Sequence, residues 1–237
     1  MKMKNRMKRS YLPTLLIAIS ALFLGSTSYA TNQNNGRPTL AKRGESVEKI
    51  VPEGWAFAHE KGDLNKDGIE DIILIAQPNY REKISTRDDG YEYNYNPNIL
   101  AIYFGTESEG YKIFKMWDNV IPTEEDEYTK YESYLKITDK GVFDIIVNFF
   151  AIAGTYGTSN TTYKFRFQSG DFFLIGKEIS GFSRSSGESS VVSYNFLTAK
   201  KCTTTGNMFD ESVKKKVVWT KLVKRRLKPL GSFYLEP

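Results

Sequence analysis

The chain has 237 residues, of which 33 are lysine or arginine and 28 are aspartate or glutamate, giving a formal net charge of +5. Five of the cations precede residue 31, in a stretch without any acid, so the rest of the sequence is neutral overall; they are Lys2, Lys4, Arg6, Lys8 and Arg9. The basic pI is therefore a property of this short leader, and the composition does not indicate a nucleic-acid-binding protein.

The first 30 residues have the pattern of a secretory signal peptide. An apolar run over residues 12–24 follows the cations, and Ser28 and Ala30 supply small residues at the −3 and −1 positions of a cleavage site before Thr31. We expect an exported protein, periplasmic or secreted; an uncleaved N-terminal anchor is the alternative. No later run reaches the ~18 apolar residues of a membrane-spanning helix, so no membrane span is expected after cleavage.

Composition divides the remaining chain into a flexible polar tether over residues 31–44 and a single β-rich domain over residues 45–237. The domain is rich in aromatic residues, which favour strands. Alternation of aromatic and polar residues over 163–168, followed by Ser-Gly-Asp and a second apolar run, predicts a hairpin. The segment 123–135 is the one with a helical pattern, since a capping-box sequence precedes tyrosines at three-residue spacing.

An acidic loop is the most informative feature of the sequence. Oxygen-bearing side chains stand at positions 1, 3, 5 and 9 of the loop, and a glycine stands at position 6; these residues are Asp63, Asn65, Asp67, Asp71 and Gly68. Ca²⁺ takes about six to eight oxygen ligands, which alternate residues of a tight loop can supply. The pattern predicts a structural calcium site, and an Asx-rich surface turn that binds no ion is the alternative.

The loop does not fit an EF-hand. An EF-hand needs a bidentate glutamate at position 12, and Leu74 stands there instead. The run from Asp71 to Ala76 is rich in β-branched residues and reads as a buried strand. The loop is therefore expected to lead into a strand rather than a helix, which also argues against a dockerin module.

At these residues the chain resembles the FG-GAP/VCBS repeats, the calcium-binding blades of integrin-α-type β-propellers. The resemblance covers residues 58–115, including a strand-like run over 100–105 and a glycine turn with an aromatic strand over 109–114. It implies an all-β fold of antiparallel, blade-like sheets, too short for a full seven-bladed propeller. It also implies a set of calcium ligands: the side chains of Asp63, Asn65, Asp67 and Asp71 and the carbonyl of Ile69.

A degenerate second copy of this repeat is expected over residues 136–176. The sequence from Gly68 to Ile73 recurs from Gly141 to Ile146, and a glycine-containing hairpin follows both. Lysine and threonine replace the loop oxygens in the second copy, so it is expected to bind no cation. Chance similarity between strand sequences is the alternative to duplication.

Enzymatic motifs are scarce. His59 is the single histidine, so Ser-His-Asp or zinc-protease chemistry would depend on it, and Cys202 is the single cysteine, so no intrachain disulfide can form. The sequence has no Gly-x-Ser-x-Gly, Walker or dinucleotide motif. Paired-carboxylate glycoside hydrolysis leaves no sequence pattern. A carbohydrate-processing enzyme with a structural calcium loop therefore stays as the second hypothesis, and no catalytic residue is assigned.

Two segments favour a binding role. Tyr91, Tyr93 and Tyr95 would place three rings on one face of an extended segment, where they could stack against a sugar or a protein; alternatively they are buried in a strand. A Gly/aromatic loop over 154–160 could join that surface. The basic run over 214–228 suits an anionic polysaccharide or lipid, or alternatively a solvated strand edge on which lysines discourage pairing. The sequence favours an exported, non-catalytic binding or scaffold module whose partner is an extracellular protein or a carbohydrate.

Overall fold

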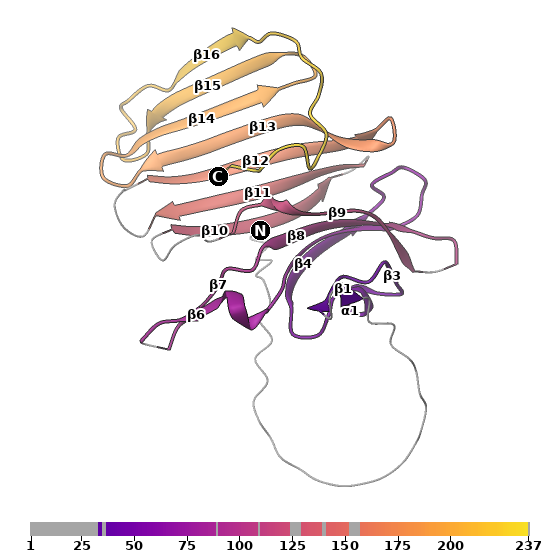
Figure 1. The fold of residues 1–237 in the computed structure, drawn as a ribbon. Coiled ribbons are helices and arrows are strands. Elements are labelled where there is room, and N and C mark those ends of the chain that lie inside the picture. The colour runs from indigo at the N-terminus through magenta and orange to yellow at the C-terminus, as the bar shows by residue number, and fades with distance from the viewer. Residues whose placement is uncertain are drawn as a thin grey trace, which may run out of the picture.

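The structure is a computed structural model that describes residues 33–34, 37–88, 90–108, 110–123, 129–138, 141–151 and 157–236. The described chain is almost entirely antiparallel β-structure, which confirms the predicted all-β class. Its two main sheets lie face to face (Figure 1). The predicted signal peptide lies outside the described residues. No helix in the described part of the chain is long and apolar enough to cross a membrane.

The smaller main sheet has five strands in the order β3-β9-β8-β5-β4. Its strands are β3 (Arg43–Gly44), β4 (Ala56–Gly62), β5 (Asp71–Gln77), β8 (Asn98–Gly105) and β9 (Tyr111–Ile121). Short elements flank it: β1 (Gln33–Asn34), β2 (Arg37–Pro38), α1 (Val47–Ile50), η1 (Arg81–Lys83), β6 (Ile84–Thr86) and β7 (Glu92–Asn94). β6 and β7 form a hairpin of their own, outside both main sheets.

The larger sheet has seven strands that follow one another in chain order. They are β10 (Thr129–Thr138), β11 (Val142–Ala151), β12 (Gly157–Gln168), β13 (Asp171–Ser183), β14 (Glu188–Asn195), β15 (Lys200–Asn207) and β16 (Lys216–Lys221). This sheet curls into a half-barrel. The hairpin predicted around residues 163–175 is confirmed, because β12 and β13 pair across a turn at Ser169 and Gly170 whose φ angles are 51° and 78°.

β5 is apolar throughout because both faces of its sheet are covered. Ile73 and Ile75 point into the core between the two main sheets, while Ile72, Leu74 and Ala76 point into a second cluster on the opposite face. The N-terminal segment covers that second face with Leu40, Val47, Ile50 and Trp55. A continuous apolar run, rather than an alternating one, is what a strand buried on both faces requires.

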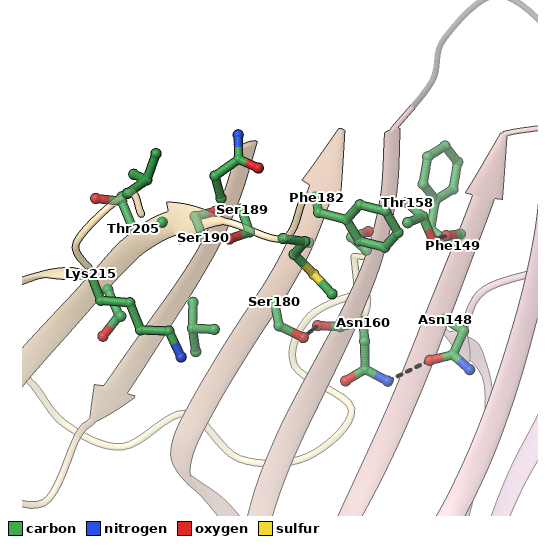
Figure 2. A pocket seen from close by; sticks show the side chains of 18 of the residues that line it. Asn148, Phe149, Thr158, Asn160, Ser180, Phe182, Ser189, Ser190, Thr205 and Lys215 are labelled. Carbon is green, nitrogen blue, oxygen red and sulfur yellow. Dashed lines mark hydrogen bonds between the residues drawn. The ribbon is translucent and has the colours of Figure 1, made fainter. Parts of the chain in front are cut away.

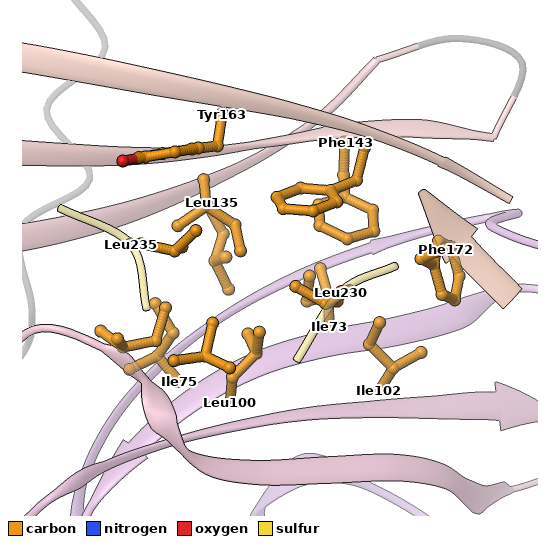
Figure 3. Packing of buried hydrophobic residues seen from close by; sticks show 14 of the residues in the cluster. Ile73, Ile75, Leu100, Ile102, Leu135, Phe143, Tyr163, Phe172, Leu230 and Leu235 are labelled. Carbon is orange, nitrogen blue, oxygen red and sulfur yellow. The ribbon is translucent and has the colours of Figure 1, made fainter. Parts of the chain in front are cut away.

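The core between the sheets is closed by the end of the described chain. Figure 3 shows Tyr163, Phe143 and Leu135 on the larger sheet facing Ile73, Ile75, Leu100 and Ile102 on the smaller one, with Leu230 and Leu235 between them. The Leu230 N–H donates to the Phe172 carbonyl at 2.8 Å, and the Leu235 N–H donates to the Val120 carbonyl at 3.0 Å. The last described residues thus tie the two sheets together.

Two expectations need correction. The helical pattern over 123–135 is wrong for its second half, because residues from Thr129 onward form β10, whose pairing with β11 buries Leu135. The tether expected over 31–44 extends too far, since Leu40 is buried and Arg43–Gly44 pairs with Tyr111 and Lys112. Tertiary packing determines the conformation of both segments, and neither residue spacing nor local polarity reveals that packing.

The expected duplication has a counterpart in the topology. β4-β5-β8-β9 and β10-β11-β12-β13 are each four consecutive neighbours of an antiparallel sheet. Gly68 and Gly141, which precede β5 and β11, both have positive φ, and Ile72 and Ile145 are both fully buried in the strands that follow. This arrangement is what a duplication requires, and common ancestry of the two halves remains a prediction.

Candidate functional site

The acidic loop connects β4 to β5 and is organised by its own carboxylates. Asp63 Oδ1 accepts the backbone N–H groups of Lys66 and Asp67 at 2.6 and 3.1 Å, and Asp63 Oδ2 accepts that of Gly68 at 3.0 Å. Asn65 Nδ2 donates to Asp67 Oδ2 at 2.8 Å. Gly68 has a φ of 85°, a conformation that favours glycine, and this explains the glycine at position 6.

Asp71 is the buried member of the loop. Its Oδ2 accepts the N–H groups of Leu64 and Asn65 at 2.8 and 3.2 Å, and its Oδ1 accepts that of Gly105 at 2.9 Å. Burial raises the pKa of Asp71 above its usual range; these three hydrogen bonds act in the opposite direction, and the negative charge of Asp67 adds to the rise. The backbone N–H groups therefore offset only part of the cost of burying this carboxylate.

The loop lies where the two sheets meet. Leu64, within the loop, is fully buried in the core between the sheets. Gly141, directly before β11, lies so close to the loop that a Cβ there would stand 3.0 Å from the Leu64 carbonyl oxygen. A Cβ on Gly62, at the end of β4, would likewise stand 3.0 Å from Ile137 on β10. The conformation of the loop thus affects the packing of both sheets.

The predicted calcium ligands Asp63, Asn65 and Asp67 are joined by the hydrogen bonds above, and Asp71 is held behind them by backbone N–H groups. In the part of the chain that the structure describes, no three His, Cys, Asp or Glu side chains form a group that could hold a metal ion. A calcium site in this loop would combine the carboxylate oxygens with two other oxygens, those of the Asn65 amide and the Ile69 carbonyl. A carboxylate has about four acceptor positions, and Asp63 uses three of them.

The three predicted tyrosines lie on the β6–β7 hairpin and contact one another. The ring centroids of Tyr91 and Tyr93 are 4.8 Å apart, and those of Tyr93 and Tyr95 are 6.1 Å apart. Tyr91 is 39% exposed, but Tyr93 is only 9% exposed, and Arg87 donates to its hydroxyl at 3.3 Å. The rings share one face, as their spacing predicts, and only the first presents a large exposed surface.

A groove that the sequence did not predict crosses the larger sheet on the face turned away from the core. Its volume is about 1160 Å³, and residues of β10 to β15 and of the β15–β16 connection line it. Strand pairing aligns one row of its side chains across five strands: Asn148, Asn160, Ser180, Val191 and Thr204. Figure 2 shows Asn148, Asn160 and Ser180 side by side on neighbouring strands, with Phe182 beyond them.

Amide and hydroxyl groups lie along the middle of this groove, among a larger apolar surface. Asn160 Nδ2 donates to Asn148 Oδ1, and Ser180 Oγ donates to the Asn160 carbonyl at 3.4 Å. A second row, two residues along the strands, contributes Phe150, Thr158, Phe182 and Ser189. The Arg184 guanidinium lies 4.4 Å from the centre of the Phe150 ring. The groove therefore combines uncharged hydrogen-bonding groups with aromatic and aliphatic surface, and charged residues line it on β10 and in the β15–β16 connection: Lys130, Glu132, Glu211, Lys214 and Lys215.

Part of this groove overlaps a segment singled out in the sequence. The predicted Gly/aromatic loop over 154–160 begins outside the described residues, but Thr158 and Asn160 lie on β12 and line the groove. The signal in the sequence is the continuous polar run over residues 158–162 of β12. Their neighbours on β11 and β13 become visible only when the strand register is known. His59 lies on β4, its ring 6.1 Å from that of Phe57, and is not part of the groove.

The fold and these features define an antiparallel two-sheet β-protein with an acidic loop where the sheets meet and an open groove across the larger sheet. No family model, curated protein or solved structure matches the chain. The likeness to FG-GAP/VCBS repeats over residues 58–115 thus remains a prediction made from the residues themselves.

Proposed function

We propose that the mature chain is an exported, non-catalytic binding module that holds an uncharged oligosaccharide chain in the groove of the larger sheet. The observation that carries this proposal is the row from Asn148 to Thr204, in which four of the five side chains are amides or hydroxyls and which Phe150 and Phe182 border. Amides and hydroxyls both donate and accept hydrogen bonds, as sugar hydroxyls do. Aromatic faces add apolar contact area for the C–H faces of sugar rings.

The length of the row suits a chain rather than a single sugar. Neighbouring strands lie about 4.8 Å apart, so the four spacings from β11 to β15 extend over roughly 19 Å. A ligand lying across the strands would meet a polar side chain of this row on four strands and Val191 on β14. This repeated spacing supports recognition of a linear, repeating molecule.

The distribution of acids supports binding over hydrolysis. Glycoside hydrolysis needs two carboxyl groups that flank the bond to be broken. The groove is lined by two acids, Glu132 on the β10 side and Glu211 in the β15–β16 connection, and the central row is free of them. Glu132 also accepts a hydrogen bond from the Tyr134 hydroxyl. A carbohydrate-processing enzyme remains the second hypothesis, and it requires Glu132 and Glu211 to act as the catalytic pair.

A structural Ca²⁺ in the acidic loop belongs to the same proposal. Asp63, Asn65, Asp67 and Asp71 would ligate it through side chains and Ile69 through its carbonyl. The buried Asp71 carboxyl supports this, because no lysine or arginine is among the groups that shift its pKa. A cation would supply the missing positive charge, and its role would be to fix the loop against both sheets.

Binding can be tested by affinity electrophoresis and calorimetry with soluble cello-, xylo- and manno-oligosaccharides. We expect at least one series to bind and Asn160→Ala to weaken it about tenfold, since one hydrogen-bonding group is worth about 0.5–1.5 kcal/mol. Thr203→Ala is the matched control, because Thr203 lies on the opposite face of β15 from Thr204. Equal binding by both variants, or none by the wild type, would contradict the proposal.

The same samples separate binding from catalysis. Release of new reducing ends, abolished by Glu132→Gln, would favour the enzyme hypothesis. Binding without release favours the module.

A further inference from the structure

We propose that β16 is a docking edge for an extended, acidic segment of a partner protein, which adds to the larger sheet as an eighth strand. In the described part of the chain, β16 pairs with β15 on one side only. An edge strand presents unpaired N–H and C=O groups that another chain can bind. The groove reaches β15 and is lined at that end by Lys214 and Lys215, but the free backbone edge of β16 faces away from β15, so the proposal does not depend on the oligosaccharide assignment.

The backbone register shows which groups are available. The Leu222 N–H donates to the Ala199 carbonyl at 2.8 Å, and bonded pairs alternate along an antiparallel ladder. Thr220, Val218 and Lys216 therefore bond to β15. The N–H and C=O groups of Val217, Trp219 and Lys221 point to the free edge.

The centre of β16 is apolar and unusually open. All six of its residues are exposed, and Trp219 is 68% exposed between Val218 and Thr220. Lysines on an edge strand ordinarily discourage pairing. Here Lys216 and Lys221 stand at the two ends, and Val217, Val218 and Trp219 form a centre that a partner strand could cover.

The charge around β16 distinguishes between two possible partners for this edge, a second copy of the chain and an acidic strand of another protein. Eight cations and no acid occur between residues 214 and 228: Lys214, Lys215, Lys216, Lys221, Lys224, Arg225, Arg226 and Lys228. All eight are exposed. A second copy of the chain paired along β16 would bring its own eight cations against these, and like charges on neighbouring strands destabilise a pair. A strand with acids at both ends and an apolar centre would instead complement β16.

The probe is a capped synthetic peptide, Glu-Thr-Val-Thr-Val-Glu flanked by glycines, titrated against the full mature chain by calorimetry and tryptophan fluorescence. We expect it to bind, and we expect the same peptide with lysine in place of glutamate to bind at least about tenfold more weakly. A peptide with N-methylated backbone should also fail, because it cannot form the ladder.

Two variants at one position isolate the backbone contribution. Val217→Pro removes an N–H that points to the free edge without removing a bond to β15, and edge strands tolerate proline. We expect Val217→Pro to weaken peptide binding about tenfold, while Val217→Ala, which keeps the N–H, changes it much less. Asn160→Ala in the groove should leave peptide binding unchanged, so the two proposals can fail separately.

Three outcomes would overturn the proposal. The first is equal binding of the glutamate and lysine peptides. The second is heparin or anionic vesicles binding as well as the peptide, with all of them indifferent to Val217→Pro; this would mark a basic surface rather than a docking edge. The third is concentration-dependent self-association that Val217→Pro abolishes, which would assign the edge to a second copy of the chain.

Discussion

The Tyr111 hydroxyl donates a hydrogen bond to Glu70 Oε1 at 2.8 Å, which links the start of β9 to the end of the acidic loop. Lys61 on β4 completes the group, because its Nζ lies 3.1 Å from the Tyr111 hydroxyl and 3.3 Å from Glu70 Oε1. Three separate segments of the smaller sheet thus meet beside the loop. The cluster is partly exposed, so its contribution to stability is expected to be small.

This cluster gives a pH-dependent prediction. The Tyr111 hydrogen bond, and secondarily Lys61, lowers the pKa of Glu70 from its ordinary value of 4.5. A lowered pKa contributes stability that is present above the unfolded value and is lost as the pH falls through the folded value. We expect Tyr111→Phe to destabilise the protein by less than about 1 kcal/mol at pH 7 and by almost nothing near pH 3. Urea unfolding at both pH values measures this difference.

Carboxyl NMR titration provides the direct check. Tyr111→Phe should raise the pKa of Glu70 toward its ordinary value. An unchanged titration curve would show that the hydroxyl does not interact with Glu70 in solution.

Calcium should stabilise the folded protein if the acidic loop binds it. At a concentration 100 times its Kd, a ligand specific for the folded state adds about 2.7 kcal/mol, which raises the melting temperature by several degrees. Extracellular calcium modules often bind at about 10⁻⁴–10⁻³ M, so millimolar Ca²⁺ is required. Thermal melting of metal-free protein, with and without calcium, measures the shift.

Two substitutions make this measurement specific. Asp67→Ala should abolish the calcium shift, since it removes a predicted ligand. Asp144→Ala, at the corresponding strand of the second half, removes an ion pair with Lys164 and should lower the melting temperature while leaving the calcium shift intact. A wild-type melting curve that is the same in millimolar calcium and in chelator would leave the loop as a hydrogen-bonded turn.

Closure of the core by the chain end predicts a strong effect at Leu235. This side chain is fully buried between the sheets, so Leu235→Ala is expected to cost about 2–5 kcal/mol of unfolding free energy. Val223, which is 79% exposed, supplies the matched control, and Val223→Ala should change stability by less than about 0.5 kcal/mol. Denaturant unfolding compares the two variants, and similar midpoints would show that residues 229–236 do not pack as described.

Local sequence patterns predicted those elements in which the order of apolar and polar side chains follows their burial. The β-branched run after Asp71 predicted β5, and the alternation before Ser169 predicted β12 together with its hairpin. The segment from Thr129 is different, because its tyrosine spacing fits a helix while its place beside β11 makes it a strand. A pairing partner downstream in the sequence overrode a local preference there.

The groove shows the same limit at the level of a site. Asn148, Asn160 and Ser180 come from three strands, and none of them belongs to a recognisable motif. They align only because the register sets Asn148 opposite Asn160 and Asn160 opposite Ser180. In the acidic loop, by contrast, the whole predicted ligand set lies within nine consecutive residues, so spacing alone sufficed to propose it.

The order of strands in the larger sheet bears on how the chain reaches this fold. Each strand from β10 to β16 pairs with the next one along the chain, and the turns at 169–170, 184–187 and 196–199 are short. Loop-closure entropy is therefore lost in small steps, and each hairpin can form before the following strand is available. Residues 229–236 are the exception, since they must return to β9 and β13. We expect hairpin formation to be fast and the docking of this last segment to limit the rate at which the native core forms.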